Sequence, residues 1–363
     1  MRDLINTAQN EILNYPKRST ADKLKNVAKK LLGRGGYVKD PINWPNGLLA
    51  VGLMDMFAAG LIDEKDTEPV TKLRDKWAKT GFNVRRPEDA IAGHAFFLKG
   101  LPEATKIYES LLSAPTDSHG SLLYNPRVKD EILADMIGMA VPLLVDFKNY
   151  DMAAKQITNF LDYGFDEKTG LPYHGYKCNS GDSGASGNSG DSVAVGILGW
   201  GRAVGWILMG EAYFLKYADR KHKDYTRILE AFNSLSTAVL ACQRPDGLYG
   251  WQLPGQNNHI DTSATAMILG ALVMGADAAG IEGVGGAENG AAKVLEAAKK
   301  GADGISKYIK DGQIYDGLAE CPGPGIHPQV YGAYPWTLGP YLSLMAGLKV
   351  EQEYLWSIKK GQE

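Results

Sequence analysis

"VAVGILGWGRAVGWILMGEAYFL", residues 193–215, is apolar on nearly every side, and so is "TSATAMILGALVMGA" at residues 262–276. Both are rich in Gly and Ala, as expected of helices that other elements surround. In other segments the apolar residues recur three and four positions apart, which predicts amphipathic helices with one face on a core. Such segments include residues 103–114, 152–165, 225–243 and 291–309. Two classes of helix indicate two layers.

A short piece made of a Gly turn and aromatic residues recurs between the expected helices. It reads "HGSLLY" at Gly120, "TGLPYH" at Gly170, "DGLYGW" at Gly247 and "DGQIYD" at Gly312. This recurrence predicts an internal repeat of helical pairs. About six pairs fit best into an all-α ring, an (α/α)6 barrel or toroid, with the Gly-aromatic pieces around one mouth. A single domain would then cover residues 1–363, and an open helical solenoid is the competing architecture.

Composition excludes several classes of function. The 363-residue chain is 44% hydrophobic and 22% charged, which is typical of a globular protein with a large core. A net charge of −3 gives no basic field for nucleic acid. Without an apolar run of about 18 residues or a signal-peptide region, we expect a cytoplasmic protein that does not enter membranes. The three cysteines lie far apart and lack CxxC spacing, so we expect free thiols and neither a disulfide framework nor a structural zinc site. The sequence shows no cluster of metal ligands, and we expect no metal and no cofactor.

Residues 179–192, "NSGDSGASGNSGDS", are Gly, Ser, Asn and Asp apart from one Ala. Such a segment cannot bury enough apolar area to offset its ordering entropy. It joins the Gly-aromatic piece that contains His174 to the apolar stretch that contains Trp200 and Arg202. We therefore expect a flexible loop over the mouth of the barrel rather than a linker between domains.

Two aspartates are candidates for acid–base chemistry. Asp135 interrupts the apolar run around Ile132 and Met139, where a carboxylate is costly unless it is paired, hydrogen-bonded or capping a helix. In a functional role, burial would raise its pKa and suit it to proton transfer. Asp89 lies in the first turn of a helix expected to begin at Pro87, where the helix dipole alone favours an acid. Both residues stay open between structural and catalytic roles.

Aromatic and polar side chains at other helix starts are candidates for binding. Arg202 lies between Trp200 and Trp206, so a guanidinium could pair with a substrate carboxylate while indoles cover a sugar ring. The alternative is an arginine that pairs with a structural acid. The remaining candidates lie at expected turns or helix starts: Trp44, Asn46, His174, His259, Asp261, Thr262 and Ser263. For Asp261, Thr262 and Ser263 the alternative is an ordinary N-cap of the following helix.

The order of the motifs carries a family resemblance. "ADMIGMA" at 134–140, "TGLPYHGY" at 169–176, "WGRAVGW" at 200–206 and "DTSATA" at 261–266 follow one another along the chain. This series resembles glycoside hydrolase family 105, the unsaturated rhamnogalacturonyl hydrolases, and more distantly family 88, the unsaturated glucuronyl hydrolases. The resemblance covers most of the chain and implies an (α/α)6 barrel.

The resemblance also implies roles and a reaction. Asp135 matches the catalytic aspartate, and Asp89 matches a second acid in the same cleft. His174, Trp200 and Arg202 match residues that line the subsite for the unsaturated uronic acid. Trp44, Asn46, Thr262 and Ser263 remain substrate-binding candidates from their positions in the sequence. Water would add across the C4=C5 double bond that a polysaccharide lyase leaves, and the resulting hemiketal would release the sugar without a metal. The alternatives are an epimerase or inverting glycosidase on a similar barrel, or a non-catalytic saccharide-binding toroid.

Overall fold

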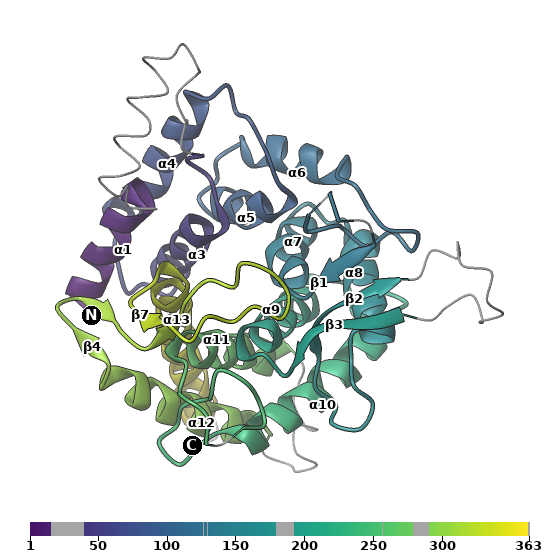
Figure 1. The fold of residues 1–363 in the computed structure, drawn as a ribbon. Coiled ribbons are helices and arrows are strands. Elements are labelled where there is room, and N and C mark those ends of the chain that lie inside the picture. The colour runs from purple at the N-terminus through teal and green to yellow at the C-terminus, as the bar shows by residue number, and fades with distance from the viewer. Residues whose placement is uncertain are drawn as a thin grey trace.

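The computed structural model describes residues 1–15, 40–125, 127–128, 130–178, 192–255, 257–278 and 290–361. Within these residues, six largely apolar helices form a closed ring in which each contacts the next and the last returns to the first. They are α3 (Trp44–Ala58), α5 (Ala90–Leu98), α7 (Asp135–Asp146), α9 (Gly201–Tyr217), α11 (Thr262–Ala278) and α13 (Pro335–Gly361). Figure 1 looks along the axis of this ring. The predicted inner layer is confirmed.

A second set of helices surrounds the ring (Figure 1). These are α1 (Arg2–Asn14), α4 (Glu68–Ala78), α6 (Ala104–Leu112), α8 (Tyr150–Tyr163), α10 (Tyr225–Cys242) and α12 (Gly290–Ser306), with the 3-10 turns η1 (Glu64–Thr67) and η2 (Pro87–Asp89) between them. Each outer helix buries one face. In α8, for example, Ala153, Ile157 and Phe160 are buried at a spacing of three or four residues. The chain is therefore an (α/α)6 barrel, and the closed ring rules out the open solenoid.

Glycines let the inner helices approach closely. A Cβ on Gly52 of α3 would overlap the backbone of Gly339 in α13, and one on Gly138 of α7 would overlap the Trp206 ring of α9. Protein interiors are close-packed, so the added atom could be accommodated only by moving the helices apart. The Gly-rich and Ala-rich composition of the inner helices is thus a requirement of their packing.

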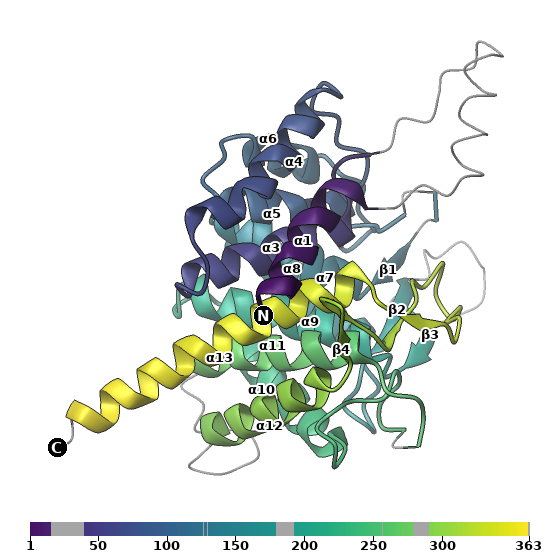
Figure 2. The same cartoon turned by 90° about the vertical axis from the view of Figure 1, so that its left-hand side faces the viewer.

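Short strands gather at one end of the barrel (Figure 2). Strands β1 (Glu131–Leu133), β2 (Tyr173–Cys178) and β3 (Ser192–Leu198) form an antiparallel sheet in the order β1-β2-β3, with Ile132 opposite Tyr176. Two smaller ladders follow, β4 (Ile309–Lys310) with β5 (Gln313–Ile314), and β6 (Gly317–Leu318) with β7 (Tyr331–Gly332). The segment between β6 and β7 crosses the mouth of the ring in Figure 1.

The glycines of the recurring pieces make the turns that the sequence predicts. Gly120, Gly170, Gly247 and Gly312 have φ values of 85°, 66°, 85° and 69°, a region that other residues rarely adopt. The chain that follows is extended in every case: Tyr173 begins β2, Gln313 begins β5, and Leu122 and Gly250 form isolated bridges. The predicted repeat of Gly turns and extended pieces is confirmed.

The prediction of one helix over residues 193–215 is wrong at its first part. Ser192–Leu198 is strand β3, and α9 begins at Gly201. Alternating β-branched residues at Val193, Val195 and Ile197 favour a strand, and Gly199 has a φ of 68°, which a helix does not allow.

Two further expectations from the sequence concern the Gly/Ser segment at residues 179–192 and the membrane. The Gly/Ser segment predicted to be a loop lies outside the described residues except for Ser192, while the strands on its two sides pair with each other at Cys178 and Ser192. Among the described helices, none is long and apolar enough to cross a membrane.

Candidate active site

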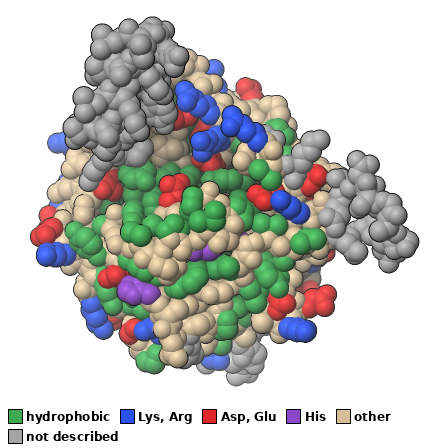
Figure 3. All heavy atoms as spheres, viewed as in Figure 1, with side chains coloured by type: hydrophobic (Ala, Val, Ile, Leu, Met, Phe, Trp, Pro, Cys, Tyr) green, Lys and Arg blue, Asp and Glu red, His purple; other side chains and the backbone are tan. Residues whose placement is uncertain are grey.

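A cavity of about 520 Å³ opens at the end of the barrel that bears the strands. Arginines and carboxylates share its wall, and Figure 3 shows basic and acidic side chains close together on this face, beside a band of hydrophobic ones. The charged residues that line it are Arg85, Arg86, Glu88, Arg127, Glu131, Asp135 and Glu320. Tyr124, His174, Cys321 and residues 322–324 complete most of the remaining wall.

Asp135 is the first residue of α7, and its side chain makes no helix cap. Its Oδ2 atom instead lies 3.1 Å from Nε2 of His174 in β2. The backbone holds the two elements together, because the Ala134 N–H donates to the His174 carbonyl at 2.9 Å. The side chain of Asp135 is 14% exposed and that of His174 is 3% exposed. The capping interpretation of Asp135 is therefore wrong, and its carboxylate faces the cavity beside a buried imidazole.

The surroundings of His174 favour its charged form. Burial alone would lower the pKa of His174, but its interactions with Asp135 and Cys321 outweigh this effect and raise the pKa to about 9. The ring packs against Trp200, with the ring centroids 4.3 Å apart. Near neutral pH the imidazolium therefore pairs with the Asp135 carboxylate and fixes its direction.

Glu88 and Tyr124 also face the cavity, and the sequence candidates did not include them. Nη1 of Arg86 lies 3.1 Å from Oε1 of Glu88, whose side chain is buried. Burial, followed by the charge of Glu88, raises the pKa of Tyr124, so its phenol stays protonated. The signal that was available in the sequence is the pair of adjacent acids at Glu88 and Asp89.

Asp89 has a different environment. Its Oδ2 atom accepts the backbone N–H groups of Arg85 at 3.1 Å and Arg86 at 3.3 Å, and burial raises its pKa to about 8. Asp89 lines an adjoining pocket of about 210 Å³ together with Trp44. This pocket shares Arg85, Arg86, Glu88 and Glu320 with the larger cavity. Asp89 thus supports the chain that carries two arginines of the wall, and it is not among the described residues that line the cavity with Asp135.

Arg202 lies behind the wall of the cavity. It is buried, and its Nη1 and Nη2 atoms donate to the carbonyls of Leu318 and Ala319, each at 2.7 Å. The guanidinium also lies 3.7 Å from Oδ2 of Asp261 and over the Trp200 ring. These contacts match the alternative of an arginine paired with a structural acid. They hold the segment after β6, which carries Glu320 and Cys321, against α9.

The remaining sequence candidates have structural partners. Asp261 accepts the Ser263 N–H at 2.9 Å at the start of α11, which matches the N-cap interpretation. Thr262 donates its hydroxyl to the Tyr315 carbonyl, and Asn46 donates its amide to the Pro41 carbonyl. Of the candidates Trp44, Asn46, His174, Trp200, Arg202, Thr262 and Ser263, only His174 is among the described residues that line the cavity with Asp135.

Comparison with known proteins gives the family. The model of "Glycosyl Hydrolase Family 88" matches residues 99–338, which is more than half of the chain and includes Asp135 and His174. The chain belongs to glycosyl hydrolase family 88. A search of curated proteins gives no match.

Solved structures show the same fold for this family 88 hydrolase. One is a family 105 glycoside hydrolase from C. acetobutylicum ATCC 824, with 19% identity and a TM-score of 0.71 over 92% of this chain and 100% of that one. Another is a possible family 105 member from Salmonella enterica serovar Paratyphi A, with 13% identity and a TM-score of 0.74 over 97% of this chain and 94% of that one. A third is the unsaturated glucuronyl hydrolase from Bacillus sp. GL1, with 17% identity and a TM-score of 0.69 over 97% of this chain and 95% of that one.

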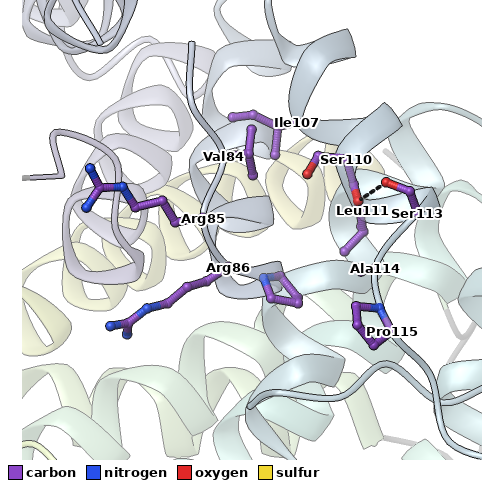
Figure 4. A pocket seen from close by; sticks show the side chains of 10 residues that line it. Val84, Arg85, Arg86, Ile107, Ser110, Leu111, Ser113, Ala114 and Pro115 are labelled. Carbon is purple, nitrogen blue, oxygen red and sulfur yellow. Dashed lines mark hydrogen bonds between the residues drawn. The ribbon is translucent and has the colours of Figure 1, made fainter. Parts of the chain in front are cut away.

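The family 88 hydrolase has a smaller pocket on the other side of residues 84–87, with a volume of about 190 Å³. Figure 4 shows that the side chains of Arg85 and Arg86 point away from Ser110, Leu111 and Ala114 of this pocket. Both arginines line the larger cavity as well. Their guanidinium groups therefore belong to the mouth of the barrel.

The structure of the family 88 hydrolase also brings together three possible metal ligands. His174, Cys321 and His327 each offer a donor atom, and these atoms lie within 4.8 Å of one another. The sequence predicted no metal site, because its cysteines lie far apart and lack the short spacings of common metal-binding motifs. His174 lies in β2, whereas Cys321 and His327 lie between β6 and β7, so only the folded chain places them side by side.

Proposed function

We propose that this family 88 hydrolase releases an unsaturated uronic acid from lyase-generated oligosaccharides by hydrating the C4=C5 double bond. The observation that carries the proposal is the Asp135 carboxylate, which faces the cavity, makes no helix cap and is held by His174. The likeness to a structure described as an unsaturated glucuronyl hydrolase supports the same reaction.

Positive charge in the cavity supports an anionic sugar. A chain of net charge −3 needs local cations to bind a uronate. Arg85 lies 3.3 Å from Asp40 and Arg86 is paired with Glu88, while Arg127 is an exposed residue of the cavity wall. A planar guanidinium binds a carboxylate through two parallel hydrogen bonds. Arg127 is therefore our choice for the group that first meets the substrate carboxylate.

The proposed reaction adds one water molecule. The Asp135 carboxylate receives a proton from the His174 imidazolium through their 3.1 Å contact and passes it to C4. It then removes a proton from the water that attacks C5 and returns it to His174, so both groups end in their starting states. The new hydroxyl on C5 makes a hemiketal, whose ring opens, and the bond to the neighbouring sugar then breaks. His174 keeps the carboxylate directed into the cavity. Carboxylate separations that distinguish retaining from inverting enzymes do not apply, because the anomeric carbon is not the reacting centre.

A second candidate is ordinary glycoside hydrolysis at the anomeric carbon. The observation in its favour is that Glu88 lines the same cavity as Asp135, so the site holds the two carboxyl groups that such enzymes use. This reaction would cleave a saturated uronyl disaccharide, whereas hydration requires the double bond. An epimerase or a binding protein would cleave neither.

The proposal is tested with disaccharides produced by polysaccharide lyases, of both the rhamnogalacturonyl and glucuronyl types. We expect the ultraviolet absorbance of the double bond to fall as the second sugar is released, and the faster of the two substrates identifies the preferred class. Cleavage of a saturated disaccharide would support the second candidate. Binding without loss of absorbance would support a non-catalytic toroid.

We also propose that residues 1–363 form a single domain. Helix α13, near the C-terminus, contacts α3, α11 and α12, so the two ends of the chain share one core. Thermal unfolding followed by far-ultraviolet and near-ultraviolet circular dichroism should show one coincident transition. Two separated transitions would contradict a single domain.

A further inference from the structure

The cluster of His174, Cys321 and His327 has the donor atoms of a transition-metal site. We propose that these residues bind a divalent cation of the zinc class in the wall of the cavity, independently of the function proposed above. Zinc takes imidazole nitrogen and thiolate sulfur at about 2.0–2.3 Å, so ligands around one ion lie about 3.4–3.7 Å apart. The donor atoms lie within 4.8 Å of one another, so an inward movement of at most about 1.4 Å would bring them to these separations.

His174 is oriented as a metal ligand. Its Nε2 atom is hydrogen-bonded to Asp135, and its Nδ1 atom is buried without a hydrogen-bond partner among the described residues. Histidines that bind metals commonly hold a carboxylate with the other ring nitrogen, which fixes the ring. A cation on Nδ1 would take the place of a proton and leave the contact with Asp135 intact.

His327 lacks polar partners in the structure. Both of its ring nitrogens are buried and without a hydrogen-bond partner among the described residues. Its ring centroid lies 5.7 Å from that of His174 and 5.0 Å from that of Trp200. A buried polar atom without a partner costs free energy, and a bound cation would satisfy one of the two nitrogens.

Cys321 supplies a free thiol on the wall of the cavity. Its Sγ atom lies 2.9 Å from the Gly323 carbonyl, a contact that a metal-bound thiolate would give up. Cys321 and His327 belong to the segment between β6 and β7, which contains Gly323 and Gly325 and no helix. An approach of these two residues to His174 would therefore not displace a helix of the barrel.

The cluster leaves one position open on the metal. His174 and Cys321 line the cavity, whereas His327 is not among its described lining residues. Three protein ligands and a fourth position open to solvent or substrate are typical of catalytic zinc sites. The fourth ligand would be an oxygen of water or of a bound sugar.

The test measures metal binding directly. The purified full chain is stripped with a chelator, supplied with Zn²⁺, freed of excess metal by gel filtration and analysed for zinc. A second sample receives Co²⁺, whose bond to a thiolate gives a charge-transfer absorption in the near ultraviolet. We expect about one ion per chain, because the three residues form one ligand set, and we expect the cobalt–thiolate band.

Matched variants identify the ligands. Cys321→Ser should remove the cobalt–thiolate band, and Cys321→Ser and His327→Gln should each weaken zinc binding at least about tenfold. Two control variants replace residues outside the cluster: Cys242, a half-buried thiol on α10, and His259, a half-exposed histidine. Cys242→Ser and His259→Gln should each bind zinc as tightly as the parent does. Circular dichroism confirms that each variant is folded.

Zinc content far below one ion per chain, or a band that persists in Cys321→Ser, would overturn the proposed site. No substrate enters these measurements, so a chain that binds zinc but hydrates no double bond refutes only the proposed function. A chain that hydrates the double bond without binding zinc refutes only the metal site.

Discussion

Nε2 of His174 lies 3.1 Å from Oδ2 of Asp135, and this contact joins a strand of the mouth to the first residue of an inner helix. The histidine is almost fully buried, whereas the aspartate keeps a part of its surface open to the cavity. One side of the carboxylate is thus fixed, and the other is free to meet a substrate.

Replacement of Asp135 should remove activity and leave the fold intact. Asp135→Asn keeps the size of the side chain, but its amide cannot accept and pass on the proton that the carboxyl group transfers. Turnover should therefore fall at least about a hundredfold. Glu131→Gln is the matched control, since Glu131 lines the same cavity but pairs with Lys177 at 3.3 Å. Steady-state kinetics and thermal melting compare the three proteins. A folded Asp135→Asn protein with the turnover of the parent would show that the catalytic assignment is incorrect.

Arg127→Gln should weaken substrate binding more than it slows turnover. The arginine lies on the rim of the cavity and is exposed, so its loss removes an attraction for the uronate without disturbing the core. We expect KM to rise about tenfold, because one charged hydrogen-bonding pair with the substrate is lost, and kcat to change little. Arg227→Gln on α10 is the control, because Arg227 pairs with Asp162 away from the cavity. Equal KM values for the two variants would place the uronate elsewhere.

Arg202→Lys should destabilise the protein although it keeps the charge. Lysine cannot reproduce the two bonds to the carbonyls of Leu318 and Ala319, both at 2.7 Å. The free energy of unfolding should fall by about 2 kcal/mol, since hydrogen bonds to buried charged groups contribute this much. Arg227 forms an exposed ion pair with Asp162, so Arg227→Lys should lower the free energy of unfolding by less than about 1 kcal/mol. Urea unfolding measures both, and equal stabilities would mean that Arg202 does not hold the segment after β6.

Asp89 should make stability depend on pH in a defined direction. Burial raises its pKa from 3.8 to about 8, so between these values the folded protein keeps a proton that the unfolded chain has lost. Folding stability therefore falls as the pH rises through this range, by the linkage of proton binding to unfolding. Asn does not ionise, so the stability of Asp89→Asn relative to the parent should increase from pH 4 to pH 8 and then level off. Denaturant midpoints of both proteins check this, and a difference that is constant or falls with pH would contradict the buried neutral carboxyl.

The barrel was predictable because its signals are local. Apolar stretches such as residues 262–276 and amphipathic ones such as 152–165 show their layer through composition and spacing. Residues 193–198 were misassigned because their apolar side chains continue directly into those of α9, and a short apolar run does not distinguish a strand from a helix.

The site was predictable only in part. Asp135 is conspicuous as a carboxylate within an apolar run, and His174 follows a Gly turn at the mouth. Glu88 and Asp89 are neighbours in one turn, so the direction of each side chain depends on contacts that sequence alone does not specify. Cys321 and His327 approach His174 only when the segment between β6 and β7 folds across the ring.

The central claim is that water adds across the C4=C5 double bond at Asp135. The most direct test runs the reaction in D₂O with an unsaturated uronyl disaccharide and follows the products by NMR. Hydration predicts that the olefinic H4 signal disappears and that the released uronic acid carries deuterium at C4, with both changes lost in Asp135→Asn. Release of a sugar that retains the C4=C5 double bond, without deuterium at C4, would contradict the account.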